Sequence, residues 1–245
     1  MAGNFQIGLD AFSKGDYAIA LREWAMLAEK GDVTAQFSLG LMYKTGQGVE
    51  KDDHIAFSWF KLAAEQGYAD AQSNLGVMYD KGNGVSMDYM AAIRWYTHAA
   101  EQGHVAAQFN LGMMYETGKK IIRNYETAAK WYNLAAEQGS AHAQHNLGSL
   151  YKNGNGVPQD YEAAFKWYSL AAEQGDAASQ NNLGFMYAEG QGTKQDLNFA
   201  YMWWDISASQ GDKVALNNLK IFEAEMSSAE METAQLFSFD YQNVH

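Results

Sequence analysis

The sequence predicts an all-α solenoid made of antiparallel helix pairs, and three observations carry this prediction. The string Ala-Ala-Glu-Gln-Gly recurs every 36 residues, at 63–67, 99–103, 135–139 and 171–175. Within each repeat, apolar residues recur at the intervals of three and four that are typical of a helix. The 245 residues include 23 Gly but only one Pro. Because the two rise together in disordered or collagen-like chains, these glycines indicate fixed structural positions.

The repeat divides the chain into regular units and two diverged ends. Dividing the chain after the glycine that ends each repeat gives five units of equal length, at 32–67, 68–103, 104–139, 140–175 and 176–211. Residues 1–31 are expected to form an N-terminal capping helix pair, and 212–245 C-terminal capping helices. In the latter, Ser227 and Glu230 offer a capping box for a last helix over about 228–239. A single unit cannot cover its apolar face, so neighbouring units must stack.

The first helix of each unit contains Leu-Gly-x-x-Tyr, with Met before the Tyr in four of the five units and glycine in the helix interior. Such a glycine costs roughly 0.5–1 kcal/mol relative to alanine. We expect the partner helix to pack so closely there that no Cβ fits, with a tryptophan ring beside the glycine. The glycines are Gly40, Gly76, Gly112, Gly148 and Gly184, and the tryptophans are Trp59, Trp95, Trp131, Trp167 and Trp203.

A glycine-containing loop and a capped second helix complete each unit. Gly82 and Gly84 lie where the first helix must stop and the chain must adopt positive φ. Asp88 follows, close to the positive dipole end of a second helix. The only proline, Pro158, falls in about the first turn of such a helix, where its missing N–H costs nothing.

These motifs closely resemble the SEL-one-like repeat family, a relative of the tetratricopeptide repeat. The match covers 32–211 strongly, through Leu-Gly-x-Met-Tyr-x-x-Gly-x-Gly-Val, Asp-Tyr-x-x-Ala, Trp-Tyr and Ala-Ala-Glu-Gln-Gly, and both ends weakly. The resemblance implies a right-handed α-solenoid that acts as a protein-interaction scaffold, with partners that differ between members. One branch of the family carries a disulfide in each repeat, and the absence of Cys excludes that branch. The regular repeats favour a bacterial source.

If the first helices line a concave face, as in tetratricopeptide repeat proteins, their positions outside the core are candidates for binding a partner. Large apolar groups left on a surface usually mark an interface, although these side chains could instead pack against the neighbouring unit. Asparagines close to the glycines resemble those with which certain tetratricopeptide repeat proteins hold a peptide main chain. Alternatively, these asparagines form a hydrogen-bond ladder between helices. The candidates are Phe37, Leu41, Asn74, Val77, Phe109, Asn110, Met113, His145, Asn146, Asn182 and Phe185.

The partner is expected to be a protein or peptide segment of neutral or basic character. No Lys or Arg stands four residues before the asparagines, as capture of an acidic C-terminal peptide would need. A secondary patch, Lys119, Lys120 and Arg123, gathers three cations in one loop and could contact an acidic partner, or it could simply be a solvated loop.

Catalytic and metal-binding motifs are missing, so we predict a protein without enzymatic activity, metal or cofactor. The Gly-x-Gly loops lack a preceding strand and a third glycine, and the sequence has no Gly-x-Ser-x-Gly or His-Glu-x-x-His motif. His142 and His145 could start a zinc site with His104, but no carboxylate with a supporting role is evident.

The formal net charge of −12 makes nucleic acid an unfavourable partner, because such binding requires cations that neutralise phosphates. No apolar stretch approaches the length of a membrane span. The N-terminus shows no signal peptide, so we expect a soluble cytoplasmic monomer, or a periplasmic or secreted one if a signal peptide has been removed.

The function predicted from the sequence is therefore that of a scaffold or adaptor that binds a partner protein in the concave groove. An immunity-like inhibitor that covers the active site of a partner enzyme is an alternative. A carbohydrate or peptidoglycan binder is a second alternative, although it would need aromatic residues outside the core columns.

Overall fold

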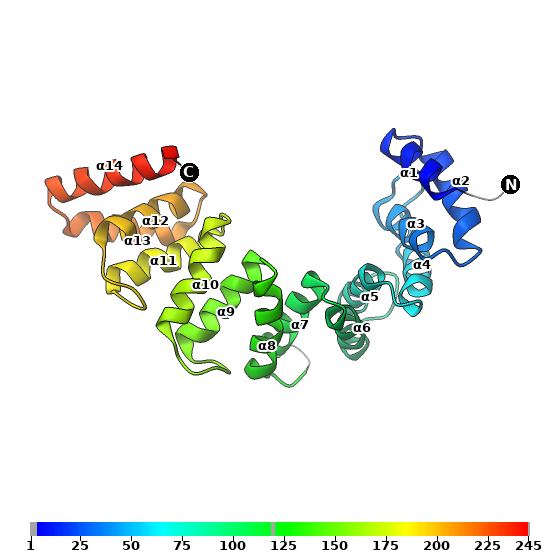
Figure 1. Ribbon diagram of the computed structural model, residues 1–245, viewed down its shortest axis with the longest axis horizontal. Coiled ribbons are helices and arrows are strands. Elements are labelled where there is room, and N and C mark those ends of the chain that lie inside the picture. Colours follow the sequence, from blue (N-terminus) through cyan, green and yellow to red (C-terminus); the bar gives the residue numbers. More distant parts are fainter. Residues whose placement is uncertain (1–3, 119–120, 245) are drawn as a thin grey trace. The chain divides into compact units, whose positions relative to one another are not determined.

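The computed structural model describes residues 4–118 and 121–244, and the side chains of 4–118 and 121–241. This part of the chain holds fourteen α-helices and no strand, as the predicted all-α fold requires (Figure 1). By its internal contacts the chain divides into two compact units, Met1–Leu111 and Gly112–His245, and the boundary falls inside one helix.

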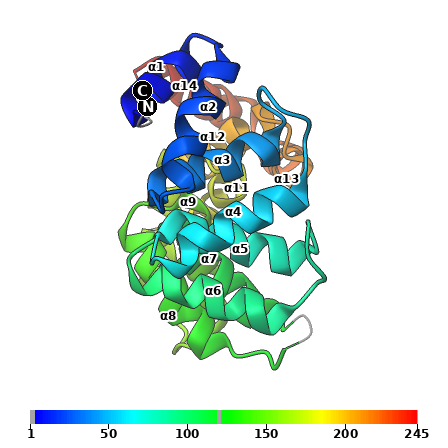
Figure 2. The same cartoon turned by 90° about the vertical axis from the view of Figure 1, so that its right-hand side faces the viewer.

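The first unit consists of helix pairs in which consecutive helices pack against each other, as Figure 2 shows for α2 to α6. Its helices are α1 (Phe5–Ser13), α2 (Tyr17–Ala28), α3 (Val33–Thr45), α4 (Asp53–Glu65), α5 (Ala69–Lys81), α6 (Tyr89–Glu101) and the first part of α7 (Val105–Thr117). Buried alanines dominate the contact surfaces, so the helices approach closely, and one large side chain such as Phe60 fills the centre of each pair.

The second unit repeats this arrangement up to α12. After the last part of α7 it contains α8 (Tyr125–Glu137), α9 (Ala141–Asn153), α10 (Tyr161–Glu173), α11 (Ala177–Glu189), α12 (Leu197–Ser209), α13 (Lys213–Glu225) and α14 (Ser228–Val244). Consecutive helices from α8 to α13 pack against each other, whereas the main partner of α14 is α12.

The helix boundaries follow from the predicted caps. Asp88 is the N-cap of α6, and its carboxylate accepts a hydrogen bond from the Ala91 amide at 2.9 Å. Gly82 ends α5 in the left-handed conformation, with φ of 72°. At Gly84, φ is again positive, and a Cβ would collide with the backbone of Asp53 in the preceding helix pair. This loop glycine therefore serves both the turn and the stacking of units.

The interior glycines do accept an aromatic ring from the partner helix, but the ring is not that of the predicted tryptophan. It belongs to the next residue: a Cβ on Gly40 would lie 2.6 Å from the ring of Phe60, and one on Gly148 would lie 3.0 Å from that of Tyr168. Neighbouring helix positions point about 100° apart, so only one of the two rings can face the glycine. Trp59 instead packs against the apolar cluster of the preceding helices.

Buried glutamines, which the sequence analysis did not single out, connect consecutive helix pairs. Gln72 is 5% exposed, and its Nε2 donates to the carbonyl of Ala64 at 3.2 Å. Its Oε1 accepts from Gln102 at 2.7 Å. The same bonds recur at Gln36 and Gln180. The signal was present in the recurring Ala-Gln and Glu-Gln-Gly strings, because a glutamine that recurs in a buried column needs partners for both ends of its amide.

The C-terminal pair departs from this pattern. Where the glycine column would continue, α13 carries Lys220, and this side chain is exposed. Only Met226 and Ser227 connect α13 to α14. The predicted capping box is confirmed: the Ser227 amide donates to Glu230 at 2.9 Å. The last helix reaches Val244 rather than 239.

α14 lies on α12 instead of completing a regular pair with α13. The ring of Phe237 packs edge-on against Phe199, with centroids 4.9 Å apart, and Tyr241 packs against Trp203. Ser238 is buried and donates to the carboxylate of Asp205 at 2.7 Å. The face of α13 that a partner helix would normally cover is therefore left partly open.

Candidate functional site

In the first unit, the candidate side chains on the first helices are partly used in packing. Phe37 is half-buried, and its ring lies 5.7 Å from Phe60 and 5.0 Å from Tyr68 of the following pair, measured between centroids. Leu41 packs against the same apolar cluster. These contacts favour the alternative in which the apolar column joins neighbouring units. Val77 and Phe109 are also half-buried.

His145 on α9 forms a polar contact with α11, the first helix of the following pair. Its Nδ1 lies 2.8 Å from the hydroxyl of Ser179 and 3.4 Å from the carboxylate of Asp176. Burial alone would raise the pKa of Asp176, but the hydrogen bonds from His145 and Ser179 outweigh it and lower that pKa to about 2. Asp176 also caps α11 through the Ser179 amide. This group therefore joins α9 to α11.

The asparagine column likewise takes part in contacts between consecutive helix pairs. Asn74 donates to the carbonyl of Asp70 at 2.8 Å and accepts from the Lys44 ammonium at 2.6 Å. Asn182 accepts from Lys152 in the same way, at 3.4 Å. Burial lowers the pKa of both lysines. Both ends of the Asn74 amide are engaged within the chain, as a hydrogen-bond ladder requires.

Two further asparagines complete the column. Asn146 donates to the hydroxyl of Tyr132 at 2.9 Å, and that hydroxyl donates to Glu116 at 2.6 Å. Burial raises the pKa of Tyr132, and the Glu116 carboxylate raises it further. Asn110 is half-buried.

The apolar side chains that the structure leaves most open in the candidate column lie in the second unit. Met113 is 41% exposed and Phe185 is 38% exposed. Lys152 lies 4.8 Å from the centre of the Phe185 ring, which is the geometry of a cation–π contact. The equivalent position of the next repeat after Phe185 is Ile221, which is 55% exposed.

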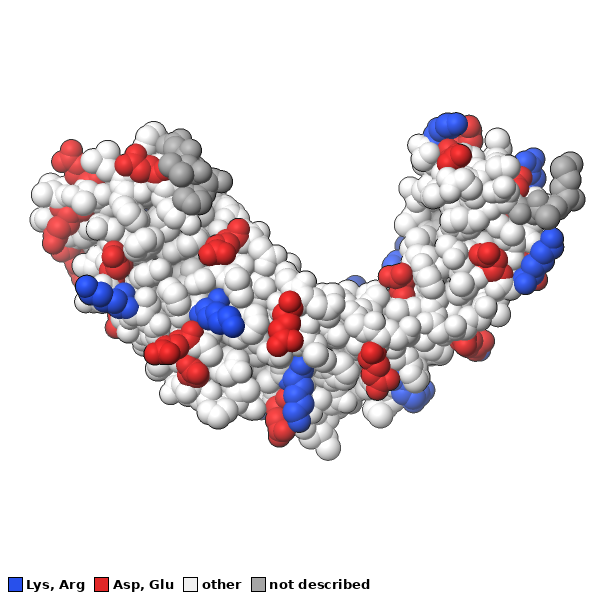
Figure 3. Space-filling model, in the orientation of Figure 1, with Lys and Arg blue, Asp and Glu red and all other residues white. Residues whose placement is uncertain are grey.

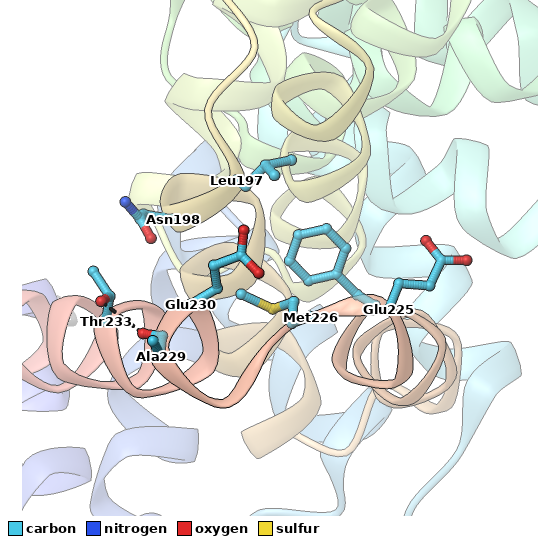
Figure 4. A pocket seen from close by; sticks show the side chains of 8 residues that line it. Leu197, Asn198, Glu225, Met226, Ala229, Glu230 and Thr233 are labelled. Atoms are coloured by element: carbon cyan, nitrogen blue, oxygen red, sulfur yellow. Dashed lines mark hydrogen bonds between the residues drawn. The ribbon is translucent and has the colours of Figure 1, made fainter.

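Phe185 and Ile221 border a depression that we call the C-terminal groove. It consists of two adjoining pockets of about 400 and 520 Å³, which share Leu197, Phe222 and Glu225. Figure 4 shows the larger pocket, where Leu197 and Asn198 at the start of α12 face Met226 and the first turn of α14. The residues that line the groove are Phe185, Ala188, Glu189, Gln195, Leu197, Asn198, Trp204, Asn218, Ile221, Phe222, Glu225, Met226, Ala229, Glu230 and Thr233.

Apolar side chains form about half of the groove's lining, and its charged lining residues are all acidic. Phe222 packs edge-on against Trp204, with centroids 5.4 Å apart, so part of its ring belongs to the core. Glu189, Glu225 and Glu230 line the pockets without any lysine or arginine among the lining residues that the structure describes. On the face seen in Figure 3, charged side chains lie singly or in small groups between broad uncharged areas.

The loop patch can be placed only in part. Lys119 and Lys120 lie outside the described residues. Arg123 is exposed, and its guanidinium lies 5.1 Å from the centre of the Tyr125 ring. Beside it, Ile122 is 88% exposed.

Within the described residues, no group of three His, Asp or Glu side chains could hold a metal ion. His104 pairs instead with Asp70, at 3.2 Å, and its Nδ1 accepts from the Ala107 amide. In the same part of the chain, no helix has the length and apolar character needed to cross a membrane.

Comparison with known proteins agrees with the repeat read from the sequence. A model of the Sel1 repeat matches five times, at 33–68, 69–104, 105–140, 141–176 and 177–212, one residue later than the predicted cuts. No curated protein matches the chain.

Solved structures also resemble the chain. A Sel1 repeat protein from Oxalobacter formigenes is 36% identical, with a TM-score of 0.82 over 87% of this chain and 88% of that one. A second, c5321, is described as a protective antigen present in uropathogenic Escherichia coli strains displaying an SLR fold. It is 27% identical, with a TM-score of 0.52 over 97% of this chain and 67% of that one.

Proposed function

Because the chain belongs to the Sel1 repeat family, we propose that it is an adaptor without catalytic activity that binds a segment of a partner protein along its first helices. Members of this family generally mediate protein–protein interactions and are typically non-enzymatic scaffolds. The partner-binding surface would run along the column that follows the interior glycines, where side chains vary while the core positions repeat.

One observation carries the proposal: large apolar side chains in this column remain in solvent at Met113 and Phe185. Polar residues could occupy such positions without loss of packing, so an exposed ring or thioether there is best explained by a partner that covers it. Phe37 and His145 contribute less, because their contacts already lie within the chain.

The test is a pull-down with the tagged full chain from cells of its source, followed by mass spectrometry. We expect the double variant Met113→Ser/Phe185→Ser to lose the partner that the unchanged chain retains. Leu134→Ser is the matched control, because Leu134 is also 41% exposed but lies on a second helix. Retention of the partner by the double variant, with the melting temperature unchanged, would contradict the proposal.

A further inference from the structure

We propose that the C-terminal groove binds a partner segment in which a large apolar side chain stands next to a lysine or arginine. The inference rests on the proposed function, because it names the chemistry of the partner at one end of the first-helix surface. It also adds residues of α12, α13 and α14 that lie outside the candidate columns.

The apolar half of the proposal follows from what lines the groove. Leu197 is 44% exposed and Ile221 is 55% exposed, and both line the same pocket as the partly buried Phe222. Ligand pockets usually measure about 300–1,000 Å³, and the two adjoining pockets, of about 400 and 520 Å³, fall within that range. Side chains of a bound segment could enter both pockets, because they share the Leu197 and Phe222 walls.

The basic half follows from the charges. Glu189 and Glu225 are the last residues of α11 and α13, and both are exposed beside the apolar walls. Glu230 is held in place by hydrogen bonds from the amide and hydroxyl of Ser227, which lower its pKa. These carboxylates would pair with a cation of the partner and repel an acidic segment, which favours selectivity more than raw affinity.

The same charges weigh against a second copy of the chain as the occupant. The sequence carries 29 acidic and 17 basic residues, so two copies repel each other. The chain's own last helix does not fill the groove, because α14 packs on α12. The short connection through Met226 holds the start of α14 at the edge of the pocket, as Figure 4 shows.

The experiment pans short random peptides displayed on phage against the purified full chain and measures the selected peptides by fluorescence anisotropy. We expect an enriched pattern that joins an aromatic or aliphatic residue to Lys or Arg. Binding should weaken when salt is raised to about 0.5 M, where the Debye length falls below about 8 Å.

Two variants test the two halves separately. Glu189→Lys/Glu225→Lys should weaken binding at least about tenfold, and folding should be kept because a lysine suits a helix C-terminus. Glu65→Lys/Glu101→Lys is the matched control: these glutamates also end helices, and neither lines the groove. Leu197→Ser, at an exposed position, should weaken binding without changing the melting temperature.

Failure of the inference and failure of the proposed function give different results. An acidic or purely polar consensus, no enrichment at all, or equal binding by both glutamate double variants would overturn the inference. The proposed function would survive this if the partner from the pull-down were lost on Met113→Ser/Phe185→Ser but kept on Glu189→Lys/Glu225→Lys. If peptides bind at the groove but Met113→Ser/Phe185→Ser retains the partner in the pull-down, the proposed function would instead be overturned.

Discussion

The two end pairs of the chain, α1/α2 and α13/α14, begin from similar sequence features and reach different structures. Both have a short connection: three residues, Lys14 to Asp16, in the first pair, and Met226 with Ser227 in the last. In the first pair, Gly8 accepts the ring of Trp24 in the same manner as the interior pairs. In the last pair, Lys220 stands where the glycine would be.

The two ends thus share a short connection but differ in the residue at this helix position and in how an aromatic ring is buried. Trp24 is 3% exposed, stacks on Phe5 and donates its indole N–H to the carbonyl of that residue. At the other end, Phe222 packs against Trp204 and its apolar cluster but remains half-exposed over the groove. The pair that has the glycine therefore buries its ring, whereas the pair that has Lys220 leaves a ring partly open.

The largest expected effect comes from removing the ring at each end. Trp24→Ala should lower the free energy of unfolding by about 3–5 kcal/mol, because a buried tryptophan leaves both its transfer free energy and a cavity. Phe222→Ala should cost less than about 2 kcal/mol, since its ring is already partly in solvent. Urea unfolding followed by circular dichroism measures both, and hydrogen exchange in α1 and α2 localises the first loss. Equal losses would show that the two ends are packed alike.

A smaller effect on stability is expected from substituting Gly8 and Lys220, the residues at the glycine position of the two end pairs. Gly8→Ala should destabilise by about 1–3 kcal/mol, because the new Cβ would overlap the Trp24 ring and overpacking outweighs the gain in helix propensity. Lys220→Ala should change the stability by no more than about 0.5 kcal/mol, because Lys220 is exposed. The same urea titration applies, and a stabilised Gly8→Ala variant would contradict the role assigned to this glycine.

Much of the fold was predictable because the same helix, cap and loop signals recur in five repeats of 36 residues. The caps, the loop glycines and the helix pairs are local features, and Asp88 and Gly82 act as the sequence indicates. The error over the tryptophan column has a simple cause. Trp95 and Tyr96 are adjacent and both apolar, so periodicity alone cannot tell which of them faces Gly76.

The candidate site was less predictable, because the exposure of its side chains depends on contacts between consecutive helix pairs rather than on the local sequence pattern. Nothing in the sequence around Phe37 reveals that Tyr68 of the following pair will cover its ring. The C-terminal groove could have been suspected from Lys220, where the glycine column stops. Its walls come from four helices, α11 to α14, and that combination follows only from where α14 packs.

The smallest expected effect concerns one carboxylate at each end. Glu23 accepts hydrogen bonds from the Arg22 guanidinium and the Asn4 amide, which lower its pKa below 4.5, and Ser227 lowers the pKa of Glu230 in the same direction. A lowered pKa in the folded state stabilises the fold at a pH above the unfolded value. That contribution is lost as the pH falls through the folded value.

Between pH 6 and pH 3, the melting temperature should therefore fall more for the unchanged chain than for Glu23→Gln or Glu230→Gln, within the window set by the ordinary pKa of 4.5. Glu23 joins the start of α1 to α2, whereas Glu230 caps only its own helix. The Glu23→Gln variant should thus show the larger difference, with exchange protection reduced across both helices of its pair. If Glu230→Gln had the larger effect, the C-terminal pair would be the more tightly coupled end, and the contrast drawn from Gly8 and Lys220 would have to be reversed.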